Sequence, residues 1–73
     1  MKYSAKKIAN ELTKTALGES YYGNALYVAL DFPCLDKADK LCLHRWLNGS
    51  NSGIDHVSLQ DIAVRIIACE VTA

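Results

Sequence analysis

Residues 58–71 read SLQDIAVRIIACEV, and this stretch decides the fold. Its aliphatic side chains recur at intervals of three and four residues, which is the spacing of one face of an α-helix. The members of that main face are Leu59, Ile62, Ala63, Ile66 and Ile67. Ser58, with Asp61 three residues later, has the form of a capping box. The pattern therefore predicts a helix from Ser58 to about Val71.

The same stretch is apolar on more than one side. Val64, Ala68 and Val71 flank the main face. Asp61 and Arg65 form its only polar ridge, with the acid four residues before the base, which is the favourable order. A helix that is apolar over most of its circumference is enclosed by neighbours. We therefore expect an all-α fold, a small bundle of four short helices around this hydrophobic C-terminal helix. Because valine and isoleucine also favour strands, an extended conformation here would overturn that prediction.

Two amphipathic helices are expected in the first half of the chain. The first runs from about Ser4, a suitable N-cap, to Leu17, and Gly18 suits the residue just past its end. The second runs from about Ser20 to Phe32, because Pro33 disfavours helical geometry in the residue before it. Its start lies at Ser20 or at Asn24, since Gly23 costs about 1 kcal/mol inside a helix.

A third helix is expected from Asp36 to Asn48, with Gly49 as its stop. Its apolar residues Ala38, Leu41, Cys42 and Trp46 face one way, and Leu43 and Leu47 widen that arc. Residues 49–57 contain two glycines and two serines around Asn51, so we expect a loop there.

Length and composition predict a single helical domain over residues 1–73, with a radius of gyration of roughly 11 Å. A three-helix core with a loosely attached second segment is the alternative. Apolar residues make up 51% of the chain, which either fills a dense core or covers a partner-binding surface. The sequence contains no signal-like run and no apolar stretch of about 18 residues that could span a bilayer. We expect a cytoplasmic protein with reduced thiols and no membrane association.

Catalytic and metal-ligating patterns are weak. Cys42 and His44 are two residues apart on a helix and point in divergent directions. A pairing of Cys34 with His56 stays open, although nothing in the spacing demands it. The cysteines and histidines lack the paired short spacings of a structural zinc site, and no phosphate-binding loop is present. We therefore predict no catalytic residue, no cofactor and no metal.

Nucleic-acid binding is a second possibility. The formal net charge is zero, but residues 1–17 contain four lysines and one glutamate, a net charge of +3. The basic residues of this segment are Lys6, Lys7 and Lys14 on the first helix, with Lys2 just before it. The third and fourth helices could suggest a helix-turn-helix, but the expected loop of about nine residues is too long for that motif. The lysines are either an ordinary solvated face or a site for an anionic partner.

Several apolar residues could instead form a patch for self-association. Tyr3, Tyr21 and Tyr27 fall off the main helical stripes, and tyrosine is enriched at interfaces. Leu43, Leu47 and Val64 could extend the patch. The predicted partner-binding residues are Lys2, Tyr3, Lys6, Lys7, Lys14, Tyr27, Leu43 and Leu47.

Three stretches, YGNALYVALDFP at 22–33, LHRWLNG at 43–49 and DHVSLQDIAVRI at 55–66, resemble small proteins encoded by enterobacterial phages and prophages. The likeness covers roughly residues 20–67 and contains no motif with assigned chemistry. It implies an accessory protein that binds and modulates a host or phage protein. We therefore expect a non-enzymatic protein-binding module, with a homodimer as one of its expected forms. A small nucleic-acid-binding regulator is the alternative.

Overall fold

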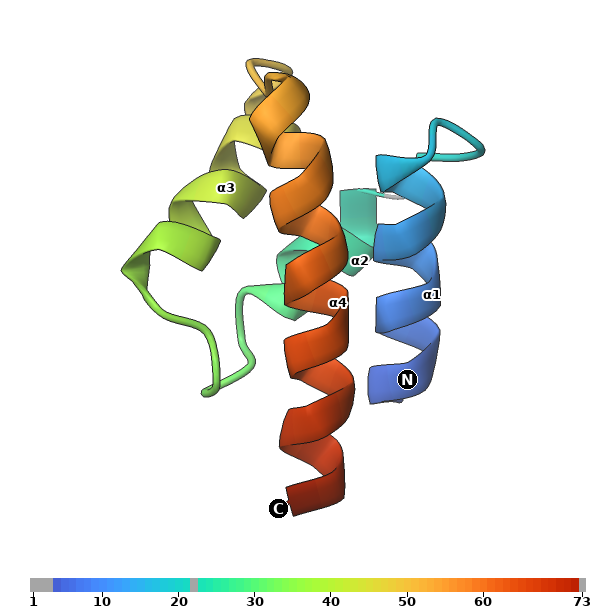
Figure 1. Cartoon of the computed structure of the whole chain (residues 1–73), viewed down its shortest axis with the longest axis vertical. Helices are drawn as coiled ribbons and strands as arrows, with labels where there is room; N and C mark the ends of the chain where they lie inside the picture. Colours follow the sequence, from blue (N-terminus) through green and yellow to red (C-terminus); the bar gives the residue numbers. More distant parts are fainter. Residues whose placement is uncertain (1–3, 22, 73) are drawn as a thin grey trace.

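The computed structural model describes residues 4–21 and 23–72, with the backbone alone for residues 70–72. This part of the chain contains four α-helices and no strand (Figure 1). The predicted all-α bundle is confirmed. Its radius of gyration, 10.9 Å, agrees with the expected value of roughly 11 Å.

The first helix, α1 (Ala5–Ala16), matches its prediction because both of its ends are determined by neighbouring residues. The hydroxyl of Ser4 accepts the backbone N–H of Lys7 at 3.1 Å and caps the start. At the other end Gly18 has a φ of +76°, which the backbone needs in order to turn away. The N–H of Glu19 then donates back to the carbonyl of Lys14 at 2.9 Å, as in a Schellman motif.

The second helix, α2 (Gly23–Ala29), is shorter than predicted and begins at Gly23, between the two expected starts. After Ala29 the chain tightens into single turns, in which the N–H of Phe32 donates to the carbonyl of Ala29 at 3.1 Å. Pro33 follows and prevents any continuation. Buried side chains attach α2 to the core, so the alternative of a loosely attached second segment is wrong.

The third helix, α3 (Lys37–Asn48), ends where predicted and begins one residue later, with Asp36 as its N-cap. Asp36 and Asp39 form a reciprocal capping box at its start, in which the N–H of Asp39 donates to the Asp36 carboxylate at 2.9 Å. Gly49, with a φ of +75°, closes the helix. Local chemistry therefore determines both ends, as in α1.

The fourth helix, α4 (Gly53–Thr72), begins at Gly53 rather than at Ser58. The loop predicted for residues 49–57 is wrong, and the connection from α3 shrinks to residues 49–52. Asp55 explains the earlier start. Its carboxylate accepts the N–H of Ser52 at 2.9 Å, while its own N–H donates to the carbonyl of Ser52 at 3.0 Å. Ser58 and Asp61 consequently lie inside the helix and cap nothing.

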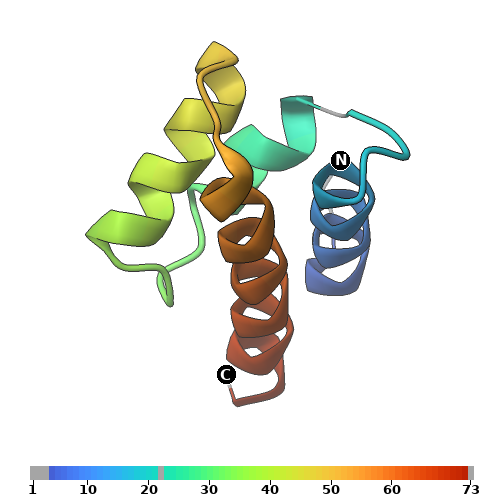
Figure 2. The ribbon, with the colours of Figure 1, turned by 45° about the horizontal axis from the view of Figure 1, so that its top comes forward.

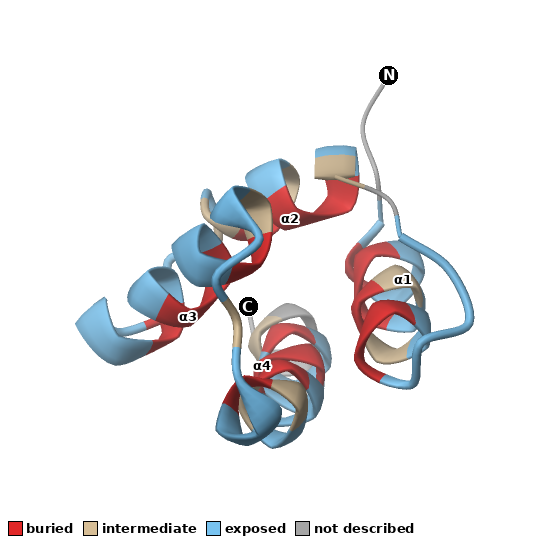
Figure 3. Cartoon of the chain, turned by 90° about the horizontal axis from the view of Figure 1, so that it is seen from above, coloured by how far each residue is buried: buried red, intermediate tan, exposed pale blue. Residues whose placement is uncertain are grey.

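The helix α4 lies between α1 and α3, and it runs antiparallel to α1 (Figures 1 and 2). Viewed along the helices, α2 lies across the far side of the core from α4 (Figure 3). The side of α4 that points away from the other helices is exposed (Figure 3). Enclosure of α4 is therefore incomplete, because α1 and α3 cover only its inner side.

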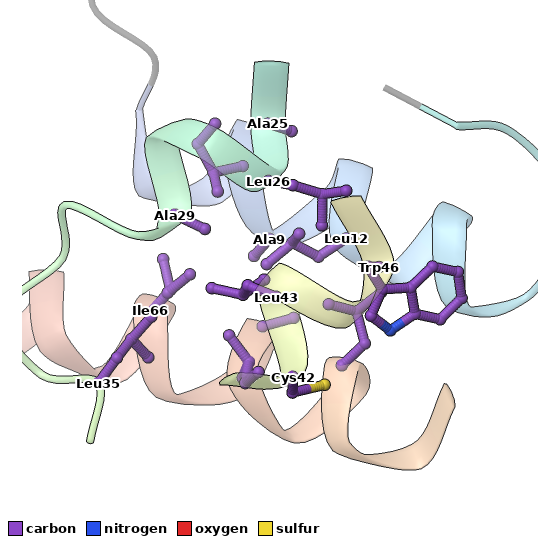
Figure 4. Close-up of a cluster of buried hydrophobic side chains, with 14 of the residues drawn as sticks. Ala9, Leu12, Ala25, Leu26, Ala29, Leu35, Cys42, Leu43, Trp46 and Ile66 are labelled. Carbon is purple, nitrogen blue, oxygen red and sulfur yellow. The ribbon is translucent and has the colours of Figure 1, made fainter. Parts of the chain in front are cut away.

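The core brings together one side of every helix, and Leu43 lies at its centre (Figure 4). Its large, fully buried apolar residues are Ile8, Leu12, Leu26, Leu43, Leu59, Ile62 and Ile66. The predicted buried side of α3 was wrong by about one residue. Leu41 is 49% exposed and Ala38 is exposed, whereas Asp39 is buried. Asp39 can turn inward because Arg65 of α4 donates to its carboxylate at 2.9 Å.

Candidate functional site

The lysine face of α1, defined by Lys6, Lys7 and Lys14, is exposed as predicted. These residues line a shallow hollow of about 340 Å³ together with Ser4, Asn10 and Glu11. Lys2, which was predicted to belong to the same face, lies outside the described residues. Glu11 is within one helical turn of both Lys7 and Lys14, which reduces the net positive charge of the hollow. The hollow is therefore a modest site for an anion.

A second surface, which sequence reasoning did not identify as a unit, follows the outer side of α4. Its members are Ile54, Val57, Asp61, Val64 and Ala68, and we call this row the α4 outer face. Ile54 is 77% exposed, Val57 62% and Val64 67%. The steps along the row are three, four, three and four residues. That alternation is the repeat by which one helix packs along another in a coiled coil.

Asp61 is the only charged residue in the α4 outer face. Asp61 and Arg65 are both exposed, as predicted for a polar ridge, but Arg65 pairs with Asp39 of α3 instead of with Asp61. Asp61 forms no ion pair with any residue in the described part of the chain. A carboxylate without a cationic partner therefore interrupts a row of exposed aliphatic side chains.

The first turn of α4 is anchored to α3 through Asp55, which sequence reasoning had placed in a loop. Arg45 donates from Nε and Nη2 to the two carboxylate oxygens of Asp55, at 2.9 and 2.6 Å. The carbonyl of Asp55 accepts the indole N–H of Trp46 at 3.2 Å. Asp55 is 1% exposed. The two hydrogen bonds from Arg45, followed by the N–H of Ser52, hold the pKa of this carboxyl well below its usual range.

The next residue, His56, anchors the same turn to α1. Its Nδ1 is 2.9 Å from the carbonyl of Ala16, and since a carbonyl only accepts, Nδ1 carries the proton. Nε2 then accepts from the amide of Asn51 at 3.4 Å. The ring also meets Trp46 edge to face, with centroids 4.8 Å apart. His56 is thus a structural residue, and it attaches the start of α4 to α1.

The thiols of Cys42 and Cys34 lie in different environments. Cys42 is buried and its thiol donates to the carbonyl of Asp55 at 3.8 Å. Desolvation, followed by the charge of Asp55, raises the pKa of Cys42 to about 11. Cys34 is exposed, and its thiol donates to the carbonyl of Arg65 at 3.6 Å. Partial desolvation and a hydrogen bond with Cys69 raise the pKa of Cys34.

These contacts bear on the nucleophile pair that the spacing had left open. Cys34 is held against α4 by Arg65, whereas both ring nitrogens of His56 bond to other residues. A raised pKa also leaves less of a thiol in the reactive thiolate form. The arrangement of Cys34, Cys42 and His56 therefore supplies no activated nucleophile of the Cys–His type.

The remaining predicted partner-binding residues fall in separate places. Leu43 is fully buried in the core and Leu47 is partly buried against it, so the proposed extension of the patch through α3 is wrong. Tyr27 is 62% exposed on α2, the helix that lies across the core from α4 (Figure 3). Tyr3 lies outside the described residues. The structure thus separates residues that the prediction had grouped together.

The connection between α3 and α4 also bears on the helix-turn-helix motif. The connection between α3 and α4 is four residues long, so loop length no longer excludes the motif. The exposed side of α4 does argue against it, because that side presents aliphatic residues and Asp61. Its one arginine, Arg65, already pairs with Asp39. Several basic groups on one face are needed to contact phosphates.

No helix in the described part of the chain has the length and apolarity needed to cross a bilayer. Comparison with known proteins found no matching family model, no matching curated protein and no matching solved structure.

Proposed function

We propose that this chain is a non-enzymatic binding module that acts through protein–protein contacts, with the α4 outer face as its docking surface. The single observation that carries the proposal is the row of exposed aliphatic residues Ile54, Val57 and Val64, each at least 62% exposed. Exposed apolar surface of this kind is typical of interaction sites.

The way α4 is held supports the same proposal. Arg45 and His56 attach its first turn to α3 and α1, and its inner side is buried along the helix. A surface on a helix that is already attached to the fold needs less ordering on binding, so more of the contact energy contributes to affinity. A row of side chains on one anchored helix also matches the way in which a partner helix is recognised.

The biological setting that we propose depends on the predicted resemblance of residues 20–67 to phage and prophage proteins. We propose an accessory protein that works in the bacterial cytoplasm and modulates a host or phage protein. The small size and the absence of an activated Cys–His pair in the described residues are compatible with action by binding.

Affinity capture from an enterobacterial lysate tests this function. Immobilised wild-type protein should retain a partner that the Val64→Arg variant does not retain, because the arginine places a charge in the middle of the apolar row. Tyr27→Arg is the matched control, since Tyr27 is similarly exposed but lies on α2. Equal retention by all three proteins would contradict the proposal.

A small nucleic-acid-binding regulator is the second candidate, favoured by the hollow that Lys6, Lys7 and Lys14 line. Binding to DNA or RNA should weaken with rising salt, because counterions are released when phosphates are neutralised. Changing the three lysines together to glutamine should abolish that binding. No detectable binding at low salt would remove this candidate.

A further inference from the structure

Cys34 and Cys69 belong to segments that are distant in the sequence and adjacent in the fold. Cys34 lies in the connection between α2 and α3, residues 30–36, and Cys69 lies near the end of α4. The connection runs beside α4 (Figures 1 and 2), and Sγ of Cys34 is 3.6 Å from the carbonyl oxygen of Arg65. The fold therefore places the thiol of Cys34 against the last turns of α4.

The carbonyl of Arg65 identifies the neighbour of that thiol. In an α-helix the carbonyl of one residue accepts the N–H of the residue four positions later, and four positions after Arg65 is Cys69. Sγ of Cys34 thus lies beside the position of Cys69, and the two thiols are in hydrogen-bond contact. The third thiol, that of Cys42, is buried and donates to the carbonyl of Asp55 instead.

The pair is accessible and needs little movement to form a bond. Cys34 is exposed and Cys69 is half-buried, so a reagent in solution can reach the pair. Two thiols in hydrogen-bond contact must approach to the roughly 2 Å of a disulfide bond. Residues 30–36 lie outside the helices, so they can make this adjustment without breaking the hydrogen bonds of a helix.

We propose that Cys34 and Cys69 are a reversible oxidation site, which closes into an intramolecular disulfide in the presence of a low-molecular-weight disulfide such as oxidised glutathione. The thiolate of the exposed Cys34 attacks one sulfur of the small disulfide and expels the other half as a thiolate. The thiolate of Cys69 then attacks Sγ of Cys34 and expels the second half. The protein loses two electrons and two protons, and the small disulfide gains them as it becomes two thiols.

The reaction is expected to be slow. Desolvation, followed by the hydrogen bond with Cys69, raises the pKa of Cys34. Because the thiolate is the nucleophile, a raised pKa reduces the reactive fraction at neutral pH. The pair therefore responds to a sustained change in the balance of thiols and disulfides around the protein.

The bond attaches a part of α4 that has few contacts with the core. Ile66 is completely buried, whereas none of residues 67–69 is buried. Arg65 and Asp39 form an ion pair that joins this part of α4 to α3, at 2.9 Å. A disulfide between the end of α4 and residues 30–36 adds a covalent link there and restricts the unfolded chain. Oxidation therefore stabilises the bundle. This site is independent of the proposed function, since neither cysteine belongs to the α4 outer face.

Peptide mapping tests the pairing. Trypsin cleaves after lysine and arginine, so each cysteine lies in a different peptide. These peptides are 15–37 with Cys34, 41–45 with Cys42 and 66–73 with Cys69. Wild-type protein at low concentration is incubated with oxidised glutathione and digested without a reductant. Mass spectrometry should find the first and third peptides joined, from protein that remains monomeric on a non-reducing gel, and dithiothreitol should separate them. Free thiols alone, glutathione adducts alone or a disulfide between two chains would refute the pairing.

Thermal unfolding measures the effect on stability, with each protein compared with its own reduced form. Oxidation should raise the Tm of wild-type protein by roughly 10 °C, because the bond closes a long loop of the unfolded chain. Cys34→Ser and Cys69→Ser should show no such rise. Cys42→Ser is the matched control and should keep it, since a serine hydroxyl can still donate to the carbonyl of Asp55. An unchanged or lower Tm for oxidised wild-type protein, or an equal rise in Cys34→Ser, would overturn the proposal.

Discussion

The two sides of α4 differ in environment far more than in composition. The inner side contributes Leu59, Ile62 and Ile66, which are completely buried, while the outer side presents Ile54 and Val64 at 77% and 67% exposure. Hydropathy along the helix does not distinguish them. The difference arises because α1 and α3 cover one side alone. Burial on the inner side stabilises the fold, and exposure on the outer side leaves a surface for binding.

The largest expected difference in stability between the two sides of α4 comes from truncating one isoleucine on each side. Ile62→Ala should lower the free energy of unfolding by about 2–5 kcal/mol, because it removes buried methyl groups and leaves a cavity. A domain of this length has a total stability of about 4–11 kcal/mol. Ile54→Ala should change it by no more than about 0.5 kcal/mol.

Urea denaturation followed by circular dichroism measures both variants. A similar loss for Ile54→Ala and Ile62→Ala would show that the outer side is also buried in the protein as it exists in solution.

A second comparison uses the two aspartates of α4. Asp55→Asn should lower Tm by roughly 10 °C, because it removes the charge that binds Arg45 at the buried start of the helix. Asp61→Asn, the matched control on the outer side, should change Tm by no more than about 3 °C. Differential scanning calorimetry measures both, and equal Tm values for the two variants would refute the anchoring role of Asp55.

The same aspartate predicts how stability depends on pH. In the folded protein Arg45 and the N–H of Ser52 keep the pKa of Asp55 well below its usual range, whereas in the unfolded chain it is about 3.9. Between these values only the unfolded chain binds the proton, so acid favours unfolding. The stabilisation is fully present above about pH 5 and decreases as pH falls below about 4.

Thermal unfolding from pH 7 to pH 3 measures this effect. The wild-type Tm should fall more steeply than that of Asp55→Asn, which has no carboxyl at this position. Parallel curves for the two proteins would contradict the assignment of acid sensitivity to Asp55.

The smallest expected effect on stability comes from Val64→Arg, the variant that should have the largest effect on association. Because Val64 is 67% exposed, its replacement should change the free energy of unfolding of the monomer by no more than about 0.5 kcal/mol. Urea denaturation at low protein concentration measures it. A loss of several kcal/mol would mean that this position belongs to the core.

The helix ends separate what could be predicted from what could not. The start of α1 at Ser4 and the start of α3 at Asp36 were predictable, because each cap bonds to a residue three positions away. Gly18 and Gly49 were equally predictable as stops, since both need a positive φ. Local chemistry is sufficient for such features.

The start of α4 was not predictable in this way. Ser52 with Asp55 and Ser58 with Asp61 share the same spacing of a serine and an acid, so the sequence offers two equivalent starts. Arg45 and the carbonyl of Ala16 select the first one through Asp55 and His56. Those partners are ten and forty residues distant along the chain, so no local pattern shows them.

The two candidate binding surfaces also differ in how far the sequence predicts them. The lysine face of α1 was predictable because helical spacing alone places its residues together. The α4 outer face was not, because Val64 and Ile62 have similar hydropathy and differ only in what packs beside them. By itself the sequence determined four helices, most of their caps and the aliphatic character of α4, since these depend on backbone propensity and local hydrogen bonds. Tertiary structure alone decided which side of α4 is buried and where α4 begins, because both depend on contacts with α1 and α3.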